Sequence, residues 1–370
     1  MTDAPWPSMR ANRCNTAATE LHGPDAPNLK WRYDIDSWFH SPPIIDAEGT
    51  LYLGSSAGLY ALNDDGELKW YVETGENHSV SPPVLAPAGS LICTVCNEGL
   101  LFVTADGDRK DVATPNKMCG SSSPTIDDDG NIYAFVDHAA PNGQIFSGMF
   151  CFDPEGNLKY RANGGSCHHP ALTSDGYLLV KSETRFSFGG DPTECHDSFS
   201  IHSLDGKYLG GENESGYCAS GDCWGSNRWG GNCIPMCTGG GVPIYGVGKS
   251  LYIGEQRTQL QGHGNLALSA DGTIYTGIRG AFRAIGMDGV TRWERNIIGA
   301  HPVVDGRGYV YVMAHNGTLH VFDSDGSQLW QWAMPGSDAQ YFSMMGYHGL
   351  SVGPKNTLYA SYSGSLFAIG

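Results

Sequence analysis

The chain alternates short apolar runs with turns that are rich in glycine and aspartate. The stretch from residue 41 shows this clearly, since SPPIIDAEG, TLYLGSS, AGLYALNDDG and ELKWYVE follow one another without a break. Short apolar runs bounded by such turn residues are the pattern of β-strands. The stretch therefore predicts four short strands connected by tight turns.

The same arrangement recurs at intervals of about 40 residues. Its marker is a proline, followed six residues later by a glycine and nine residues later by an aromatic residue, as in Pro43, Gly49 and Tyr52. Aligned on the proline position, the units begin at Pro43, Pro83, Pro124, Pro170, Pro243, Leu266, Pro302 and Leu350. Repeats of this length with four strands each are typical of propeller blades. We therefore predict an all-β protein, a β-propeller.

Two features bear on the number of blades and on how the ring closes. Pro243 and Leu266 lie too close together for a whole unit, so we expect seven full four-stranded blades plus one irregular unit, in a ring of seven or eight blades. The last repeat ends after its third strand, and NLKWRYDI near residue 30 matches the missing fourth one. An N-terminal strand that joins the last blade would leave no open sheet edge.

This interpretation sets the domain organisation and the position of two insertions. Residues 1–28 form an N-terminal lead-in, and residues 29–370 form a single propeller domain. Extra residues at 183–197 and 211–240 interrupt the regular spacing and are expected as insertions.

Composition argues against several classes of partner. The formal net charge of −17 disfavours nucleic acid and anionic membrane surfaces, and no apolar run approaches the length of a membrane span. The 11 cysteines favour a periplasmic or secreted protein. The chain shows no signal-peptide pattern, which keeps a cytoplasmic location open. The oligomeric state stays open as well.

Histidines crowd the three positions before the proline position, where the innermost strand of each blade would begin. With 13 histidines in 370 residues, chance would place about one histidine there. The residues found are His40, Cys167, His168, His169, His263, His301 and His348. Neutral imidazole is a common ligand of copper, zinc and iron, and a ring brings distant residues to one axis. The alternative is that these side chains only make hydrogen bonds at crowded strand starts.

We expect a metal centre on the propeller axis, with copper or iron favoured and zinc as an alternative. Residues at the same position before the proline share a side-chain direction. The preferred ligand pairs on this basis are His169 with His301 and His40 with His263, followed by His168 with His348. A thiolate at Cys167 would favour copper or zinc.

Loops at the same end are expected to form a pocket and a lid over it. The segment GDCWGSNRWGGNCIPMC is rich in cysteine and tryptophan. Its cysteines and a neighbour are interpreted as two disulfides, with a zinc knuckle as the alternative; they are Cys218, Cys223, Cys233 and Cys237. The expected pocket and lid residues are His138, His196, His315, Trp224, Arg228, Trp229 and Tyr347. A disulfide-held surface decoration is the other interpretation of this segment.

The segments ALNDDGELKW, CFDPEGNLKY and VFDSDGSQLW resemble the PQQ-like propeller repeats of quinoprotein dehydrogenases and of the outer-membrane assembly lipoprotein BamB. The segment PWPSMRANRCNTA is similar to the lead-in of bacterial members of that superfamily. The resemblance implies the propeller fold but no particular function, because the superfamily contains enzymes and scaffolds. This chain has Asp-Gly where quinoprotein repeats carry Thr-Gly, and it lacks the adjacent cysteine pair that covers PQQ. We therefore do not expect PQQ as a cofactor.

Two functions follow from these observations. The first is a metal-dependent enzyme with a histidine-rich centre under a cysteine-rich lid, performing oxidative chemistry on a small molecule or peptide, with hydrolysis or elimination as the next choice. The alternative is a non-catalytic, BamB-like interaction scaffold in which the histidines are structural.

Overall fold

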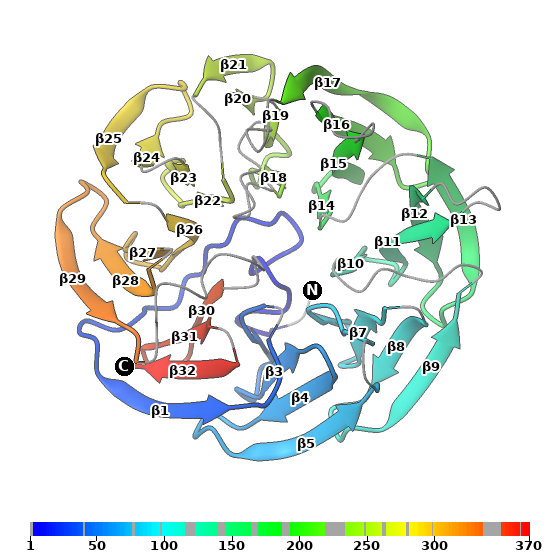
Figure 1. Cartoon of the computed structure of the whole chain (residues 1–370), viewed down its shortest axis with the longest axis horizontal. Coiled ribbons are helices and arrows are strands. Elements are labelled where there is room, and N and C mark those ends of the chain that lie inside the picture. Colours follow the sequence, from blue (N-terminus) through cyan, green and yellow to red (C-terminus); the bar gives the residue numbers. More distant parts are fainter. Residues whose placement is uncertain are drawn as a thin grey trace.

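The computed structural model describes the chain except for residues 1–2, 40, 76–77, 97, 115–122, 140–144, 164–168, 187–192, 219–233, 248, 261–263, 279–280, 298, 315, 336–348 and 363. Eight four-stranded antiparallel sheets are arranged in a ring, with their innermost strands toward the centre (Figure 1). The all-β propeller is confirmed, and the ring contains eight blades.

In each of the first four blades, the strands follow one another in sequence from the inside of the ring outwards. Blade 1 contains β2 (Ile44–Ile45), β3 (Leu51–Gly54), β4 (Gly58–Leu62) and β5 (Leu68–Glu73), and blade 2 contains β6 (Val84–Leu85), β7 (Leu91–Thr94), β8 (Gly99–Val103) and β9 (Arg109–Ala113). Blade 3 contains β10 (Thr125–Ile126), β11 (Ile132–Ala139), β12 (Ile145–Phe152) and β13 (Leu158–Asn163), and blade 4 contains β14 (Ala171–Leu172), β15 (Tyr177–Phe186), β16 (Thr193–Ser203) and β17 (Tyr208–Cys218).

The other four blades complete the ring. Blade 5 contains β18 (Met236–Cys237), β19 (Pro243–Val247), β20 (Ser250–Ile253) and β21 (Gln256–Gln259), and blade 6 contains β22 (Leu266–Leu268), β23 (Ile274–Ile278), β24 (Ala281–Ile285) and β25 (Thr291–Arg295). Blade 7 contains β26 (Gly299–Val304), β27 (Val310–Ala314), β28 (Thr318–Phe322) and β29 (Gln328–Ala333). Blade 8 contains β30 (Gly349–Gly353), β31 (Thr357–Tyr362), β32 (Ser365–Ile369) and, as its outermost strand, β1 (Leu29–Asp34).

The unit expected to be irregular is part of a complete blade. Pro243 begins β19, the second strand of blade 5, and the inner strand β18 lies before it at Met236–Cys237. The proline that precedes this inner strand is Pro235, so the sequence alignment was displaced by one strand here. The stretches expected as insertions contribute to neighbouring strands, because 183–186, 193–197 and 211–218 belong to β15, β16 and β17.

The ring closes as the sequence predicts. Strand β1 pairs antiparallel with β32, with Leu29 opposite Ile369 and Tyr33 opposite Leu366. The last blade therefore takes three strands from the C-terminal end of the chain and one from near its start, so both chain ends hold the same sheet.

The turn after each inner strand explains the repeated pattern of proline, glycine and tyrosine. In blade 1 the Asp46 carboxylate accepts hydrogen bonds from the amides of Glu48 and Thr50, and the Tyr52 hydroxyl donates to it at 2.7 Å. Gly49 has a φ of +86°, which favours glycine. Equivalent bonds link Tyr133 to Asp127 and Tyr311 to Asp305. The repeat thus encodes a turn tied to a buried tyrosine.

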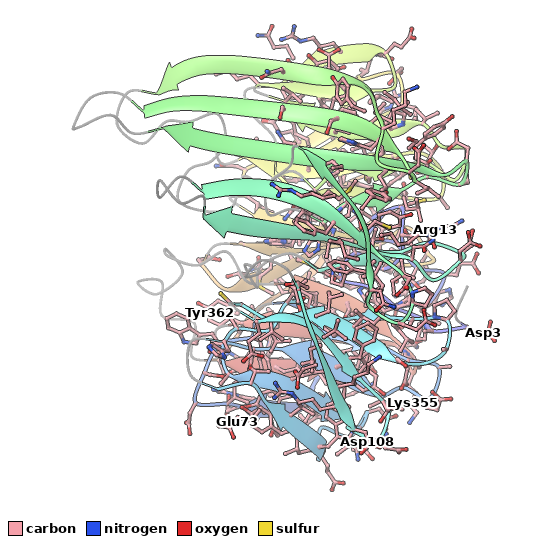
Figure 2. All side chains as sticks on the ribbon, turned by 90° about the vertical axis from the view of Figure 1, so that its right-hand side faces the viewer. Asp3, Arg13, Glu73, Asp108, Lys355 and Tyr362 are labelled. Atoms are coloured by element: carbon pink, nitrogen blue, oxygen red, sulfur yellow. The ribbon has the colours of Figure 1, made fainter. Side chains whose placement is uncertain are left out.

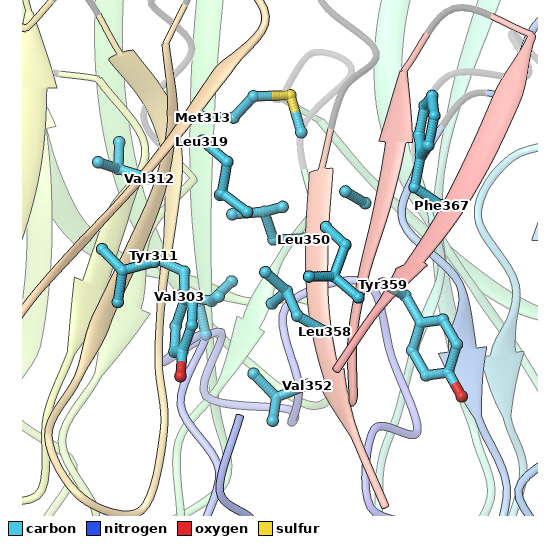
Figure 3. Packing of buried hydrophobic residues seen from close by; sticks show 14 of the residues in the cluster. Val303, Tyr311, Val312, Met313, Leu319, Leu350, Val352, Leu358, Tyr359 and Phe367 are labelled. Carbon is cyan, nitrogen blue, oxygen red and sulfur yellow. The ribbon is translucent and has the colours of Figure 1, made fainter. Parts of the chain in front are cut away.

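Neighbouring blades are joined by aromatic residues of the outer strands and by apolar packing. The indole N–H of Trp31 donates to the carbonyl of Asp64 in the next blade at 2.8 Å, and Trp70 and Trp293 make the same bond one blade further on. These three tryptophans therefore link each blade to the next. Deeper in the interface, Val303 and Leu319 of blade 7 face Leu350 and Leu358 of blade 8 (Figure 3). Other buried apolar clusters likewise span neighbouring blades.

The N-terminal segment, residues 3–28, crosses the middle of the ring before it reaches β1 (Figure 1). Its backbone carbonyls accept hydrogen bonds from the last residues of the inner strands in five blades. The pairs are Pro7 with Leu85, Arg13 with Leu172, Cys14 with Cys237, Thr16 with Leu268 and Ala17 with Val304. Trp6 also exchanges two backbone bonds with Ile45 of blade 1, and its side chain is fully buried.

These contacts distinguish the two mouths of the ring. The N-terminal segment covers the mouth at which the inner strands end, and Figure 2 shows Arg13 at this end of the molecule. Glu73 and Tyr362 lie toward the opposite end (Figure 2), where the inner strands start. We call these the strand-end mouth and the strand-start mouth. Among the described residues, no helix is long and apolar enough to cross a membrane.

Candidate functional site at the strand-start mouth

Most of the sequence-predicted site residues fall on parts of the chain that the structure does not describe. Outside the described residues are His40, Cys167, His168, Cys223, Trp224, Arg228, Trp229, Cys233, His263, His315, Tyr347 and His348. For three others the structure gives only the strand position, with His138 paired to Phe146, His196 to Thr184 and Cys218 to Thr193. The site can therefore be built from His169 and His301.

His169 and His301 each stand directly before a proline, His169 just ahead of the inner strand of blade 4 and His301 within the inner strand of blade 7. Both side chains are almost fully buried, with 7% and 8% of their surface exposed. Among the residues that the structure describes, no group of three or more His, Cys, Asp or Glu side chains is arranged to hold a metal ion. The described part of the mouth thus contains two histidines held at fixed positions.

A carbonyl group determines the tautomer of His169. Its Nδ1 atom lies 3.2 Å from the backbone oxygen of Ser123 on blade 3. A carbonyl oxygen can only accept, so Nδ1 carries the proton. In the neutral ring Nε2 then presents a lone pair, which can bind a metal or accept a proton.

His301 is held in the opposite tautomer. The amide N–H of Ile234 donates to Oδ1 of Asn265 at 3.3 Å, which turns the side-chain NH₂ of Asn265 toward His301. That NH₂ lies 2.8 Å from Nδ1 of His301 and can only donate. In the neutral ring Nε2 of His301 therefore carries the proton, and the ring offers a hydrogen-bond donor.

The backbone at His301 is also unusual. Its φ is +58°, in the left-handed region that non-glycine residues seldom adopt. The pairing of β26 with β27 shifts between Ala300 and Val303, so that His301 and Pro302 together oppose the single residue Val312. A bulge of this kind redirects a side chain and is frequent next to active sites. Backbone strain of this kind costs on the order of 1–3 kcal/mol and is typical of functional sites.

Two side chains of the N-terminal segment bind backbone carbonyls next to the two histidines. The side chain of Asn15 donates to the carbonyls of His169 and Pro235 at 3.3 and 3.1 Å. The guanidinium of Arg10 donates to the carbonyls of Leu266 and Pro302, the latter at 3.4 Å. Both side chains are buried, and arginine keeps its positive charge in proteins. A buried positive charge therefore lies against the inner strands of blades 6 and 7.

Sequence reasoning did not identify Asn265, Asn15 and Arg10. Asn265 was within reach of the repeat alignment, because it occupies the same position before Leu266 as His301 does before Pro302. Arg10 and Asn15 lie in the lead-in, where no repeat gives a register. Their position depends on the path of the N-terminal segment.

The cysteine interpretation needs one correction. Cys237, expected in a disulfide of the lid segment, is the second residue of β18 and carries a free, fully buried thiol. Its neighbour is Cys14 of the N-terminal segment, whose carbonyl accepts the Cys237 amide N–H at 3.0 Å. The chain direction explains the difference, since the inner strand carries Cys237 toward the strand-end mouth, where the N-terminal segment lies.

A separate hollow lies at the strand-end mouth. It has a volume of about 380 Å³ and is lined by the N-terminal segment and by the first turns of blades 2 and 3. The ion pair between Arg13 and Asp128, with N and O atoms 2.7 Å apart, stands in its wall. The hollow is lined by neither His169 nor His301 and is therefore distinct from the histidine site.

No protein-family model matches the chain, and no curated protein matches it in sequence. Among solved structures it is similar to quinohemoprotein alcohol dehydrogenase from Comamonas testosteroni, with 10% identity and a TM-score of 0.69 over 98% of this chain and 80% of that one. It is also similar to virginiamycin B lyase from Staphylococcus aureus, with 11% identity and a TM-score of 0.51 over 92% and 98% of the two chains. Another structure of that lyase is a catalytically inactive histidine-to-alanine variant with quinupristin.

BamB from Moraxella catarrhalis also matches, with 15% identity and a TM-score of 0.39 over 93% of this chain and 97% of that one. At these identities a likeness shows the fold and leaves the function open. The chain therefore has the β-propeller fold that its repeats predict, and the likeness to quinohemoprotein alcohol dehydrogenase is consistent with their resemblance to PQQ-like repeats.

Proposed function

We propose that this chain is an enzyme whose active site lies at the strand-start mouth, where histidines hold a transition metal, copper or iron, for oxidative chemistry on a small molecule or peptide. The observation that carries the proposal is the buried His169, whose Nδ1–H donates to the backbone carbonyl of Ser123. Metal-ligating histidines characteristically have their second ring nitrogen held in this way.

The two tautomers suggest different roles for the two histidines. His169 fits a metal ligand, because its Nδ1–H is bound to a carbonyl, the arrangement that is typical of metal-ligating histidines. His301 does not fit a ligand through Nε2 while Asn265 holds its other nitrogen. We assign it instead the role of a hydrogen-bond donor to a substrate or to an anionic group that develops during the reaction. A bound metal would supply redox or Lewis-acid chemistry at this place.

A second candidate function is an elimination that needs no metal. His169 would accept a proton through Nε2, and His301 together with the charge of Arg10 would stabilise the negative charge that develops. The specific observation in its favour is that His169 is protonated at Nδ1 and His301 at Nε2, and that the buried charge of Arg10 lies next to Pro302. The lyase of similar fold, whose histidine-to-alanine variant is inactive, is a precedent for the fold only.

Metal analysis of three single variants tests the first proposal. His169→Ala is expected to lower the metal content of the purified protein at least about tenfold, whereas His301→Ala is expected to keep most of it. His202→Ala is the control, because His202 is a buried histidine of blade 4 whose Nε2 lies 3.0 Å from the Ser200 hydroxyl, outside the mouth. Full metal retention in His169→Ala would exclude that residue as a ligand. Loss of metal in the His202 variant would show that only folding is being measured.

A further inference from the structure

Two cysteines that are far apart in the sequence meet where the N-terminal segment crosses blade 5. The amide N–H of Cys237 donates to the carbonyl of Cys14 at 3.0 Å. The thiol of Cys14 lies 3.5 Å from the carbonyl oxygen of Leu172, and the thiol of Cys237 lies 3.8 Å from the same oxygen. Both side chains therefore point toward one atom from two segments of the chain.

This geometry is suited to a disulfide. The backbone hydrogen bond between Cys237 and Cys14 holds the two Cα atoms close together, and disulfides span Cα distances of about 4.4–6.8 Å. Because the two sulfur atoms already converge on the Leu172 oxygen, a bond between them needs side-chain rotation but no movement of either backbone segment.

The two thiols differ in accessibility and in acidity. Cys14 is half-buried and Cys237 is fully buried. The pKa of Cys14 is lowered because the Cys237 thiol donates a hydrogen bond to its sulfur and because the Arg13 guanidinium is near, against the effect of burial. The pKa of Cys237 is raised, first by the same contact and then by burial. Cys14 is thus suited to attack an external disulfide, since the thiolate is the nucleophile.

We propose that Cys14 and Cys237 form a redox-active pair that low-molecular-weight disulfides such as oxidised glutathione convert to an intramolecular disulfide. The Cys14 thiolate attacks one sulfur of oxidised glutathione, and the bond between the glutathione sulfurs breaks to release one glutathione thiolate. The Cys237 thiol then loses its proton to solvent and attacks Sγ of Cys14, which releases the second glutathione. Two protein thiols are oxidised and one glutathione disulfide is reduced to two thiols.

The disulfide would fasten the N-terminal segment covalently to blade 5. The segment is also held by backbone hydrogen bonds, by the side-chain bonds of Arg10 and Asn15, by the ion pair of Arg13 with Asp128 and by the burial of Trp6. The oxidised protein would therefore keep the strand-end mouth covered under conditions that release the segment from the reduced protein. This inference does not depend on the proposed function, because it concerns the opposite mouth.

The test is peptide mapping of the full chain after equilibration with reduced and oxidised glutathione in varied ratio, acid quenching and alkylation. Cys233 and Cys237 share a tryptic peptide, so cyanogen bromide cleavage after Met236 is needed to separate them. The expected product links the peptide that begins at Cys14 to the fragment that begins at Cys237. The oxidised protein should also melt about 5 °C higher than the reduced one.

Cys14→Ser should lose both the cross-link and the rise in melting temperature. Cys96→Ser should keep both, since Cys96 is a half-buried free thiol on blade 2. The proposal is overturned if Cys14 ends as a mixed disulfide with glutathione, if it pairs with a cysteine other than Cys237, or if it stays reduced when Cys96 is fully modified.

Discussion

Replacing Gly66 by alanine should weaken the interface through which the ring closes. Gly66 lies in the turn between β4 and β5 of blade 1 with a φ of +85°, and Trp31 of the closing strand β1 lies against it. A Cβ atom at Gly66 would lie 2.6 Å from Cδ2 of this indole, inside van der Waals contact. Gly89 has the same φ of +85° but has no atom within 4 Å of the added carbon. The two sites therefore separate backbone strain from steric conflict.

The free energies follow from this comparison. Alanine at a φ of +85° costs about 1 kcal/mol at either site. At Gly66 the overpacked contact adds about 1–3 kcal/mol, and displacement of Trp31 from its 2.8 Å bond to the Asp64 carbonyl adds about 1 kcal/mol. Gly66→Ala should therefore lower the free energy of unfolding by about 3–5 kcal/mol and Gly89→Ala by about 1 kcal/mol.

Urea unfolding followed by far-ultraviolet circular dichroism measures both losses, compared at a common slope. Equal losses for Gly66→Ala and Gly89→Ala, within about 0.5 kcal/mol, would refute the packing of Trp31 on this turn. A large loss for the Gly89 variant alone would contradict the reasoning from positive φ.

Three further predictions concern the N-terminal segment, a buried histidine and the candidate site. Trp6→Ala empties a fully buried site and should lower the free energy of unfolding by about 3–5 kcal/mol in the same assay. Trp38→Ala, at a residue 47% exposed, should lower it by less than about 1 kcal/mol, and equal losses would contradict the anchoring role of Trp6. Burial lowers the pKa of His202, so the folded state favours the neutral imidazole and the melting temperature should fall as pH drops below about 6.5. The fall should be less steep in His202→Gln, and parallel pH profiles of the two proteins would contradict a contribution from His202. Asn265→Ala should leave the ring folded but remove the preference of His301 for the tautomer protonated at Nε2, read from imidazole ¹⁵N shifts; an unchanged spectrum would mean that another group sets the tautomer.

The blades could be predicted from the sequence because each one repeats a physically necessary turn. Asp46, Gly49 and Tyr52 are linked by hydrogen bonds and a positive φ, so their spacing recurs wherever the turn recurs. The register failed at blade 5 because the position nine residues after Pro235 holds Ile244 instead of an aromatic residue. Pro243, which begins the next strand, has Tyr252 nine residues later and matched the pattern by coincidence.

The site was only partly predictable, for a different reason. His169 and His301 were found because the repeat gives each residue a place relative to the inner strand. The path of the N-terminal segment could not be found in this way, because its backbone carbonyls bind the blades and any residue type supplies a carbonyl. The meeting of Cys14 with Cys237 and the positions of Arg10 and Asn15 all follow from that path.

The most direct test of the central claim is the transition-metal content of the purified wild-type chain after reconstitution, measured by mass spectrometry of the elements. The proposed metal site predicts about one equivalent of copper or iron per chain, with a melting temperature that rises on binding. Less than about a tenth of an equivalent of any transition metal, with an unchanged melting temperature, would contradict a metal centre at the strand-start mouth.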